Sequence, residues 1–477
     1  MGKDLYENPL ITRYASKEMA ENFSDDKKFR LWRKLWIALA ESERELGLNI
    51  TDEQISELKK YADDINYDRA AAFEKEVRHD VMAQIKAYGE QAKSAQGIIH
   101  LGATSCFVGD NADLIVIYNA LDIILSKLIN VINNLRNFAL KYKDLPTLGF
   151  THFQPAQLTT VGKRATLWLE DLLMDYNSLI AVKNNFKLRG VKGTTGTQAS
   201  FMELFDNDEE KVKQLEKLVV KKLGFDKVYP VTGQTYPRKF DYEVLSLLSK
   251  IAQSGYRFAN DIRLLQSMKE LEEPFETNQI GSSAMAYKRN PMRSERLCSL
   301  ARFVISAPTN AAFTAATQWF ERTLDDSANR RIVIAQAFLA TDGILKLYMN
   351  ISENLVVYDK VIAKRLMAEL PFMATENIIM EGVKRGGDRQ ILHEKIRRLS
   401  MRAAKNIKEN GGENNLIELI KKDNEFKNLK DIIDDVLEPT KYIGRAPSQV
   451  VEFIDNDIDP ILKENEDRLG QKGDISV

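Results

Sequence analysis

The stretch from Gly281 to Arg296, which reads GSSAMAYKRNPMRSER, contains residue types that could do proton-transfer chemistry on an anion. It begins with a glycine and two serines, which suggests a mobile loop. Cationic side chains then surround Asn290-Pro291, a pair typical of a helix start. Because the first turn of a helix has unpaired N–H groups and the positive end of the dipole, the stretch could bind a carboxylate while a hydroxyl reacts with it. Taken alone, it could also be a solvated basic helix start or a nuclear-localisation-like run.

Histidine, arginine and small hydroxyl residues recur in other polar segments. Among the histidines, His79 lies between Arg78 and Asp80, and His152 lies directly after Thr151. An isolated histidine of this kind is more often a surface residue than a catalyst. The remaining segments are RYAS at 13–16, HLGATS at 100–105, GVKGTTGTQ at 190–198, VTGQTYPR at 231–238 and RTLDDSANRR at 322–331. The glycines of the 190–198 segment could cradle a phosphate, but it lacks a GK[ST] ending, so we interpret it as a turn that helps to line a site.

Charge balance and cysteine content argue against several classes of protein. Lys+Arg 68 against Asp+Glu 69 leaves a net charge of -1, which favours neither nucleic acid nor an anionic membrane as a partner. No window approaches the ~20 apolar residues of a membrane span. The two cysteines, Cys106 and Cys298, lie far apart, which indicates a reducing cytoplasm rather than a disulfide framework. Without HExxH or CxxC spacing, a metal site has little support.

Long amphipathic helices must position the polar segments. Between residues 105 and 357, apolar residues recur three and four apart in five long helices, and no run convincingly predicts a strand. The helices are expected at about 112–142, 160–188, 240–271, from the basic stretch to about 318 with a break at Pro308, and from the 322–331 segment to about 354. This pattern predicts an all-α protein built on a central, elongated five-helix bundle.

Shorter helices flank the bundle and divide the chain into three helical domains. The first domain is expected at 1–104, with helices at about 25–47, 51–63, 66–77 and 79–93; the bundle at 105–357; and a smaller domain at 358–477. The bundle helices are apolar on more than one side. This additional apolar surface predicts packing against copies of the same chain in a closed homo-oligomer, although it could also be buried in the core of one chain.

The polar segments, taken in order, resemble the fumarase/aspartase superfamily. A glycine and two serines followed by Met, Lys and Asn match its signature, and the KRNP–RSER version is similar to the adenylosuccinate lyases. The motifs RYAS, RHDVMA, HLGATS, THFQPAQLTT, VKGTTGTQ, GQTYPRK and RTLDDSANRR extend the similarity over essentially the whole chain. One departure is Ala286, where the family usually has proline, so the loop should be more flexible.

The resemblance implies a homotetramer in which three subunits converge on each active site, and a β-elimination that releases fumarate. Adenylosuccinate would give AMP, and the succinyl-carboxamide ribotide SAICAR would give AICAR. The proton to be removed is on the carbon next to a carboxylate and is very weakly acidic. The reaction therefore needs a base, an acid, groups that stabilise the doubly negative aci-carboxylate and an anchor for the nucleotide phosphate. Side chains can supply all four, and no cofactor or metal is expected.

The family's roles carry over residue by residue. Ser282 resembles the general base and His152 the general acid, whose unperturbed pKa of ~6.5 suits proton transfer at neutral pH. His79 resembles the second active-site histidine, and Glu295 a residue that orients a histidine. Lys288 and Asn290 resemble the aci-carboxylate clamp. The residues that resemble contacts to the succinyl carboxylates, ribose or phosphate are Arg13, Tyr14, Arg78, Asp80, Thr104, Ser105, Thr151, Gln234, Arg296, Arg322, Ser327 and Arg331. Cys106 has no assigned role.

Three alternatives stay open at this point. Fumarase, aspartase and argininosuccinate lyase are sister enzymes, but the RYAS start, KRNP and the arginine-rich 322–331 segment favour a nucleotide substrate. A helical scaffold that has lost catalysis would lack part of the acid, base or clamp, and here all are present. A nucleic-acid-binding helical protein would need a basic face that the balanced charge does not predict.

Overall fold

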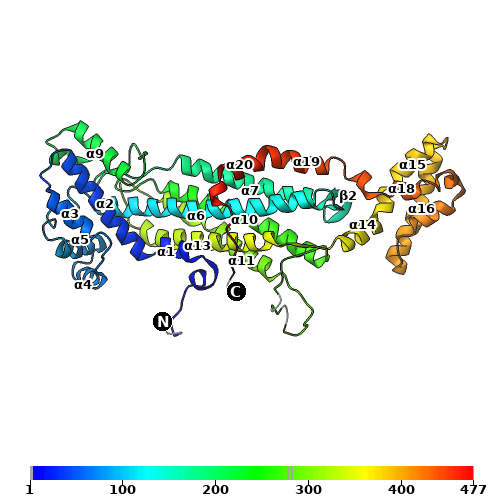
Figure 1. Cartoon of the computed structure of the whole chain (residues 1–477), viewed down its shortest axis with the longest axis horizontal. Helices are drawn as coiled ribbons and strands as arrows, with labels where there is room; N and C mark the ends of the chain where they lie inside the picture. Colours follow the sequence, from blue (N-terminus) through cyan, green and yellow to red (C-terminus); the bar gives the residue numbers. More distant parts are fainter. Residues whose placement is uncertain (1–3, 277–278, 281–282, 476–477) are drawn as a thin grey trace.

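Helices that run along one long axis give the chain an elongated shape (Figure 1). In the computed structural model the described residues are 4–276, 279–280 and 283–475. Short helices form one end, the long helices the middle, and a second set of short helices the other end. The all-α prediction is confirmed, apart from the small strands described below.

The N-terminal end contains the turn η1 (Leu10–Tyr14) and the helices α1 (Lys17–Asn22), α2 (Asp25–Glu45), α3 (Asp52–Lys60), α4 (Tyr67–Val77) and α5 (Asp80–Gln91). Side-chain caps set most of these starts, because Ser16, Ser24, Thr51 and Asn66 each accept a hydrogen bond from the first turn. Later in the chain, α8 (Ala199–Leu204) and α9 (Glu209–Lys222) return to this end, where α9 packs on α2.

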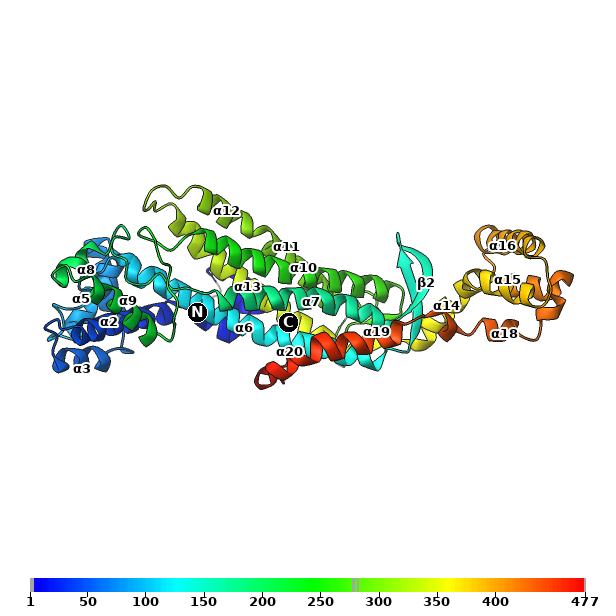
Figure 2. The same cartoon turned by 90° about the horizontal axis from the view of Figure 1, so that it is seen from above.

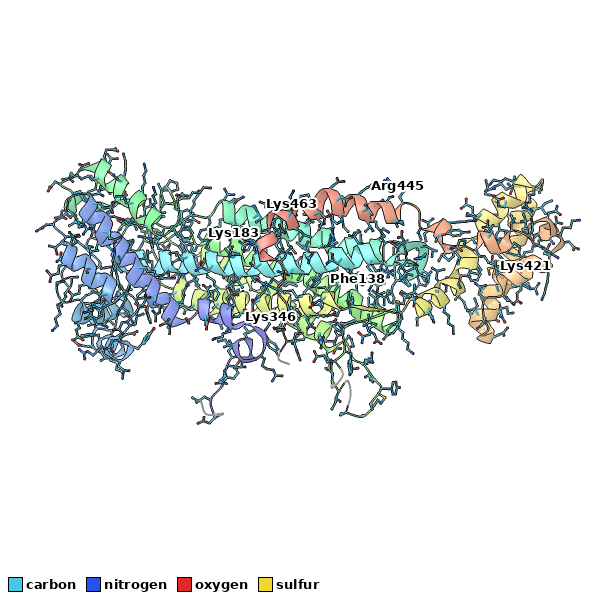
Figure 3. All side chains as sticks on the ribbon, in the orientation of Figure 1. Phe138, Lys183, Lys346, Lys421, Arg445 and Lys463 are labelled. Carbon is cyan, nitrogen blue, oxygen red and sulfur yellow. The ribbon has the colours of Figure 1, made fainter. Side chains whose placement is uncertain are left out.

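The bundle consists of α6 (Ser105–Lys141), α7 (Val161–Asn184), α10 (Lys239–Ser267), α11 (Met292–Ser306), α12 (Pro308–Ala316) and α13 (Asp326–Glu353). The predicted break at Pro308 is confirmed, since α11 ends two residues before it and α12 starts on it. The interior is closely packed, with the Phe258 and Tyr348 rings stacked at 4.2 Å. At its edge, Lys183 of α7 pairs with Asp122 of α6 at 2.6 Å (Figure 3).

A β-hairpin follows α6, where the sequence predicted only a polar loop. The strands β1 (Pro146–Thr151) and β2 (Gln154–Thr160) pair antiparallel, with Thr151 opposite Gln154. The two turn residues, His152 and Phe153, both have positive φ, 53° and 57°. Such a turn normally carries Asn-Gly, and without this pair a hairpin could not be predicted here. A second small pair joins β3 (Leu271–Glu272) to β4 (Val356–Val357).

The C-terminal end contains α14 (Asp359–Met373), α15 (Thr375–Lys384), α16 (Arg389–Asn410), α17 (Leu416–Lys422) and α18 (Ile433–Val436), most of which share a small core of their own. The chain then returns, and α19 (Ala446–Phe453) and α20 (Asp459–Glu464) lie along the bundle, where Val450 and Leu462 join the main core. Figure 3 marks this return, with Lys421 in the outer group and Lys463 beside the bundle. The domain boundaries 1–104, 105–357 and 358–477 therefore remain a prediction.

Two bundle helices have the length and hydropathy of a membrane span, so the expectation that no window approaches one was wrong. They are Ser105–Lys141 and Asp326–Glu353, and in both the apolar window is 78% buried inside the protein. Packing against neighbouring helices accounts for their apolar character.

Candidate functional site

The first group of predicted site residues lies where the N-terminal helices meet the bundle. Arg331, at the start of α13, contacts Asp80, at the start of α5, with Nη2 and Oδ2 3.4 Å apart. His79 caps α5, since its Nδ1 accepts a hydrogen bond of 3.3 Å from the Met82 N–H. An accepting Nδ1 leaves the proton of a neutral imidazole on Nε2. His79 therefore presents an N–H donor. Arg78, exposed, ends α4 in the left-handed conformation with φ 55°.

The same group continues across the start of α6. Thr104 precedes this helix without capping it through its side chain, and Ser105 is the first helical residue. Cys106 lies between two predicted substrate contacts: its Sγ is 3.1 Å from Nη1 of Arg322 and 3.7 Å from Oε1 of Gln234. Burial raises the pKa of Cys106 to about 11, so it is a neutral thiol that packs between them. Ser327, half-buried, lies in the first turn of α13.

A buried ionic network of Arg238, Asp110 and Asp326 lies next to this group. Arg238 bonds Asp110 of α6 at 3.0 Å and Asp326 of α13 at 2.6 Å, and all three side chains are at most 5% exposed. Burial alone would lower the pKa of Arg238, but Asp110 and the other acidic groups around it together raise this pKa, so the guanidinium stays charged. The network ties the Gln234 loop to the second turn of α6 and to the first residue of α13. It makes the base of the site rigid.

Three loops fit closely together beside Gln234. Arg189 donates to the Gln234 and Gly193 carbonyls, both at 2.7 Å, and the Gln234 N–H donates to Glu321 O at 3.0 Å. A Cβ on Gly196 would lie 1.8 Å from Thr232 O, so only glycine permits this approach. The 190–198 segment thus acts as a support for the Gln234 loop, which agrees with its interpretation as a turn rather than a phosphate cradle.

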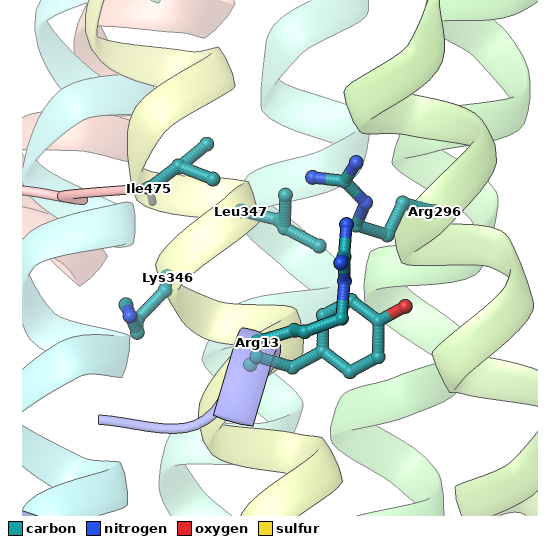
Figure 4. Close-up of a pocket in the computed structure, with 7 residues that line it drawn as sticks. Arg13, Arg296, Lys346, Leu347 and Ile475 are labelled. Carbon is teal, nitrogen blue, oxygen red and sulfur yellow. The ribbon is translucent and has the colours of Figure 1, made fainter. Parts of the chain in front are cut away.

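The second group lines a small pocket half-way along the bundle. Arg13 and Tyr14 reach it from η1 and Arg296 from α11 (Figure 4). The other residues of its wall are Gly343, Lys346 and Leu347 of α13 and Ile475 of the C-terminal tail. Two arginines and a phenol around one pocket suit a phosphorylated ligand, because the guanidinium fork matches phosphate oxygens.

A buried ion pair that the sequence reasoning missed holds η1 at this pocket. Lys127 of α6 bonds Asp342 of α13, with side chains 8% and 0% exposed. Asp342 also accepts from the Ser16 N–H at 2.5 Å, and Lys127 donates to Ser16 Oγ at 3.0 Å. Isolated charges within two long apolar helices were the only sequence signal for this pair.

The basic stretch begins a helix close to where the sequence predicts, since α11 starts at Met292. However, a carboxylate of the protein already accepts hydrogen bonds from N–H groups in the first turn of this helix. Glu273, buried, accepts from the Arg293 N–H at 3.0 Å and from the Ser294 N–H and hydroxyl at 2.9 Å each. The expectation that these amides bind a substrate carboxylate is therefore wrong, because the protein supplies its own. A carboxylate 20 and 21 residues before the two N–H groups could not be assigned to this role from sequence.

The remaining signature residues lie on the surface. Lys288 and Glu295 are exposed, and Asn290 is half-buried. Ser282, the predicted base, lies outside the described residues. In the described segment that follows, the Lys288 N–H donates a hydrogen bond to Met285 O at 3.0 Å and closes a local turn.

The third group, Thr151 and His152, is at the hairpin tip, and both residues are exposed. The hairpin follows the end of α6, whereas Thr104 and Ser105 lie at its beginning. At 1.5 Å per residue this helix separates the two ends by about 55 Å. Both views place the hairpin at the end of the bundle opposite α5 (Figure 1, Figure 2). One chain therefore does not bring His152 and His79 together.

No group of three His, Cys, Asp or Glu side chains is placed to hold a metal ion in the part of the chain that the structure describes. What the geometry provides instead is hydroxyl, amide, imidazole and guanidinium groups, divided among three regions. Such donors can bind carboxylates and phosphate and can transfer protons.

Comparisons with known proteins agree over the whole chain. Residues 12–306 match the family model described as Lyase, and residues 371–453 the model described as Adenylosuccinate lyase C-terminus. The chain is 57% identical to a Saccharomyces cerevisiae protein named adenylosuccinate lyase, covering 96% of each. It is 48% identical to a Schistosoma mansoni protein of the same name, covering 99% of each.

A solved structure supports the fold independently. The 3-carboxy-cis,cis-muconate lactonizing enzyme from Pseudomonas putida superposes with a TM-score of 0.80 at 22% identity, over 94% of this chain and 98% of that one. At this level of identity the likeness concerns the fold alone. It agrees with the superfamily resemblance of the sequence motifs.

Proposed function

The chain is a lyase of the adenylosuccinate lyase family, and we propose that it releases fumarate from adenylosuccinate, giving AMP, and from SAICAR, giving AICAR. Both substrates carry a succinyl group on nitrogen and a nucleotide phosphate. The two arginine-containing groups of the site fit these two features. The relatives' printed name supports adenylosuccinate, and SAICAR follows from the same chemistry on a similar nucleotide.

The observation that carries the proposal is the division of one site among three distant regions. A base, an acid and a phosphate anchor must meet within a few ångströms of one substrate. Since α6 alone separates the His152 and Ser105 regions by about 55 Å, the parts must come from different copies of the chain. A homotetramer with shared sites satisfies this requirement.

Exposed apolar side chains on the bundle support such an assembly. Large hydrophobic residues are exposed along α7, α10, α11 and the segment around α12, which lie side by side in Figure 2. They are Leu167, Met174, Leu264, Phe303, Phe313 and Trp319. A monomer would leave this surface in water, whereas a partner's bundle would bury it.

In the proposed mechanism, Ser282 removes the proton from the carbon next to a succinyl carboxylate. This step forms a doubly negative aci-carboxylate, and Lys288 and Asn290 stabilise it; each such donor is worth about 10²–10³ in rate. His152 of another copy then protonates the departing amine as the C–N bond breaks, a contribution of about 10²–10⁴. Fumarate and the free amino nucleotide remain.

Substrate positioning belongs to the other two groups. Gln234, Thr104 and Ser105 bind the succinyl carboxylates, and His79 contributes its Nε2–H. Arg322, Ser327 and Arg331 bind next to them, with Asp80 holding Arg331 at 3.4 Å. Arg13, Tyr14 and Arg296 bind the nucleotide and its phosphate. The two cysteines are free and buried, which agrees with a reducing cytoplasm as the proposed location.

The test is turnover of adenylosuccinate and SAICAR, followed by ultraviolet absorbance, for wild type, Ser282→Ala and His152→Ala. Wild type should release fumarate from both substrates, and each variant should lose about 10²-fold or more of kcat while it still binds AMP. His393→Ala is the matched control, because His393 is exposed on α16 far from the three groups. A wild-type protein that cleaves neither substrate would reject the proposal in favour of a sister lyase or an inactive scaffold.

A further inference from the structure

The C-terminal tail, residues 469–475, is fastened to the bundle along its length. It leaves the last short helix at Arg468, which bonds Asp122 of α6 at 3.0 Å. Asn130 of α6 then holds the chain from both sides: it donates to Arg468 O at 2.8 Å and accepts from the Gln471 N–H at 3.1 Å. The path of the tail is therefore set by specific side chains and not only by general packing.

The tail next passes directly over α13. Asn350 of this helix donates to Gly473 O at 2.9 Å. A Cβ on Gly473 would lie 2.5 Å from both Asn350 N and Lys346 O, and these are backbone atoms of a helix that cannot move aside. The φ of Gly473 is not in the left-handed region, so the glycine is needed for closeness rather than for its backbone angle.

Two residues after this contact, the tail reaches the pocket of Arg13, Tyr14 and Arg296. Ile475 forms part of the pocket wall and packs on the main core. Figure 4 shows it on the side of the pocket opposite Arg13, near Leu347. An apolar wall facing two guanidinium groups is typical of a site that binds the charged end of a ligand on one side and its ring or sugar on the other.

We propose that the C-terminal tail, seated by the Gly473–Asn350 contact, forms one wall of the nucleotide pocket and sets its affinity for the substrate's nucleotide moiety. The proposal rests on the proposed function, which assigns that pocket to the nucleotide. Because the tail touches no reacting atom, it is a binding and positioning element. Its effect falls on KM and on AMP binding rather than on kcat.

Two substitutions test separately the contact that positions the tail and the apolar side chain that lines the pocket. Gly473→Ala should lift the tail from α13 and raise KM for adenylosuccinate about fivefold to fiftyfold, since small displacements of binding groups have large effects. Ile475→Asp should raise KM on the order of tenfold or more, because a carboxylate on the wall that faces Arg13 and Arg296 competes with the phosphate for their charge. In both, kcat should stay within about twofold and the Kd of AMP should rise in parallel with KM.

A matched control is available in the same segment. Lys472→Ala changes an exposed neighbour of Gly473 and should leave KM and the thermal midpoint unchanged. If Arg13→Ala and Arg296→Ala raise KM but Gly473→Ala and Ile475→Asp do not, the tail proposal is wrong and the proposed function stands. If none of the four changes KM or AMP binding, the pocket is not the nucleotide site and the tail proposal fails, whereas turnover of adenylosuccinate by the wild type still supports the proposed function.

Discussion

Replacing Arg238 by alanine should destabilise the protein more than removing any exposed arginine. Arg238 is 2% exposed and neutralises two carboxylates, Asp110 at 3.0 Å and Asp326 at 2.6 Å, that are themselves 5% and 0% exposed. Without it, two buried negative charges face each other with only partial compensation: Asp110 keeps the Tyr236 N–H at 2.8 Å, and Asp326 keeps Arg322 at 3.7 Å. Breaking a buried pair in this way costs about 3–5 kcal/mol of unfolding free energy.

The assay is urea denaturation followed by circular dichroism, at one protein concentration for all variants because the proposed subunit association would add to stability. Arg257→Ala is the matched control: Arg257 pairs with Asp171 at 2.7 Å, but its side chain is 47% exposed, so its loss should cost about 0.2–1 kcal/mol. A loss for Arg238→Ala no larger than that for Arg257→Ala would refute the claim that this network fixes the base of the site.

Two further predictions concern other buried charges. Among the described residues, Glu43 has no hydrogen-bond partner for either carboxylate oxygen, and burial raises its pKa from 4.5 to about 9. Above pH 4.5 the unfolded chain releases this proton while the folded chain keeps it. The wild-type unfolding free energy should therefore fall by about 1.4 kcal/mol per pH unit, relative to Glu43→Gln, up to about pH 9. Urea titrations of both proteins at pH 6, 7 and 8 check this, and parallel pH profiles would contradict it. Asp342→Asn removes the charge that holds Lys127 and the Ser16 N–H, so η1 should loosen. KM for adenylosuccinate should then rise about tenfold with kcat nearly unchanged. Steady-state kinetics checks this, and an unchanged KM would show that the positions of Arg13 and Tyr14 do not depend on the Lys127–Asp342 pair.

Helical periodicity predicted the architecture because it is a local property. The five long helices, the break at Pro308 and the start of α11 all follow from apolar spacing and from proline, which act within a few residues. The hairpin after α6 could not be predicted in this way, because its turn residues His152 and Phe153 are in the left-handed conformation although neither is glycine or asparagine.

The site could be predicted only as a set of segments. Which segments meet depends on contacts between residues far apart in sequence, such as Lys127 with Asp342 or Glu273 with the first turn of α11. The role of Glu273 shows the difficulty: the basic stretch looks like an anion site because its N–H groups are counted as free, and one upstream carboxylate changes that conclusion. The tail residue Ile475 gave no sequence signal at all.

The claim that different copies of the chain complete each site can be tested by mixing two inactive proteins. His152→Ala damages the hairpin group, and Arg322→Ala damages the group at the other end of α6. After subunit exchange, verified by native mass measurement, the mixture should regain about a quarter of wild-type activity, because at random one site in four receives both intact groups. A fully exchanged mixture that stays inactive would contradict the account, since it would place His152 and Arg322 of the same chain in one site.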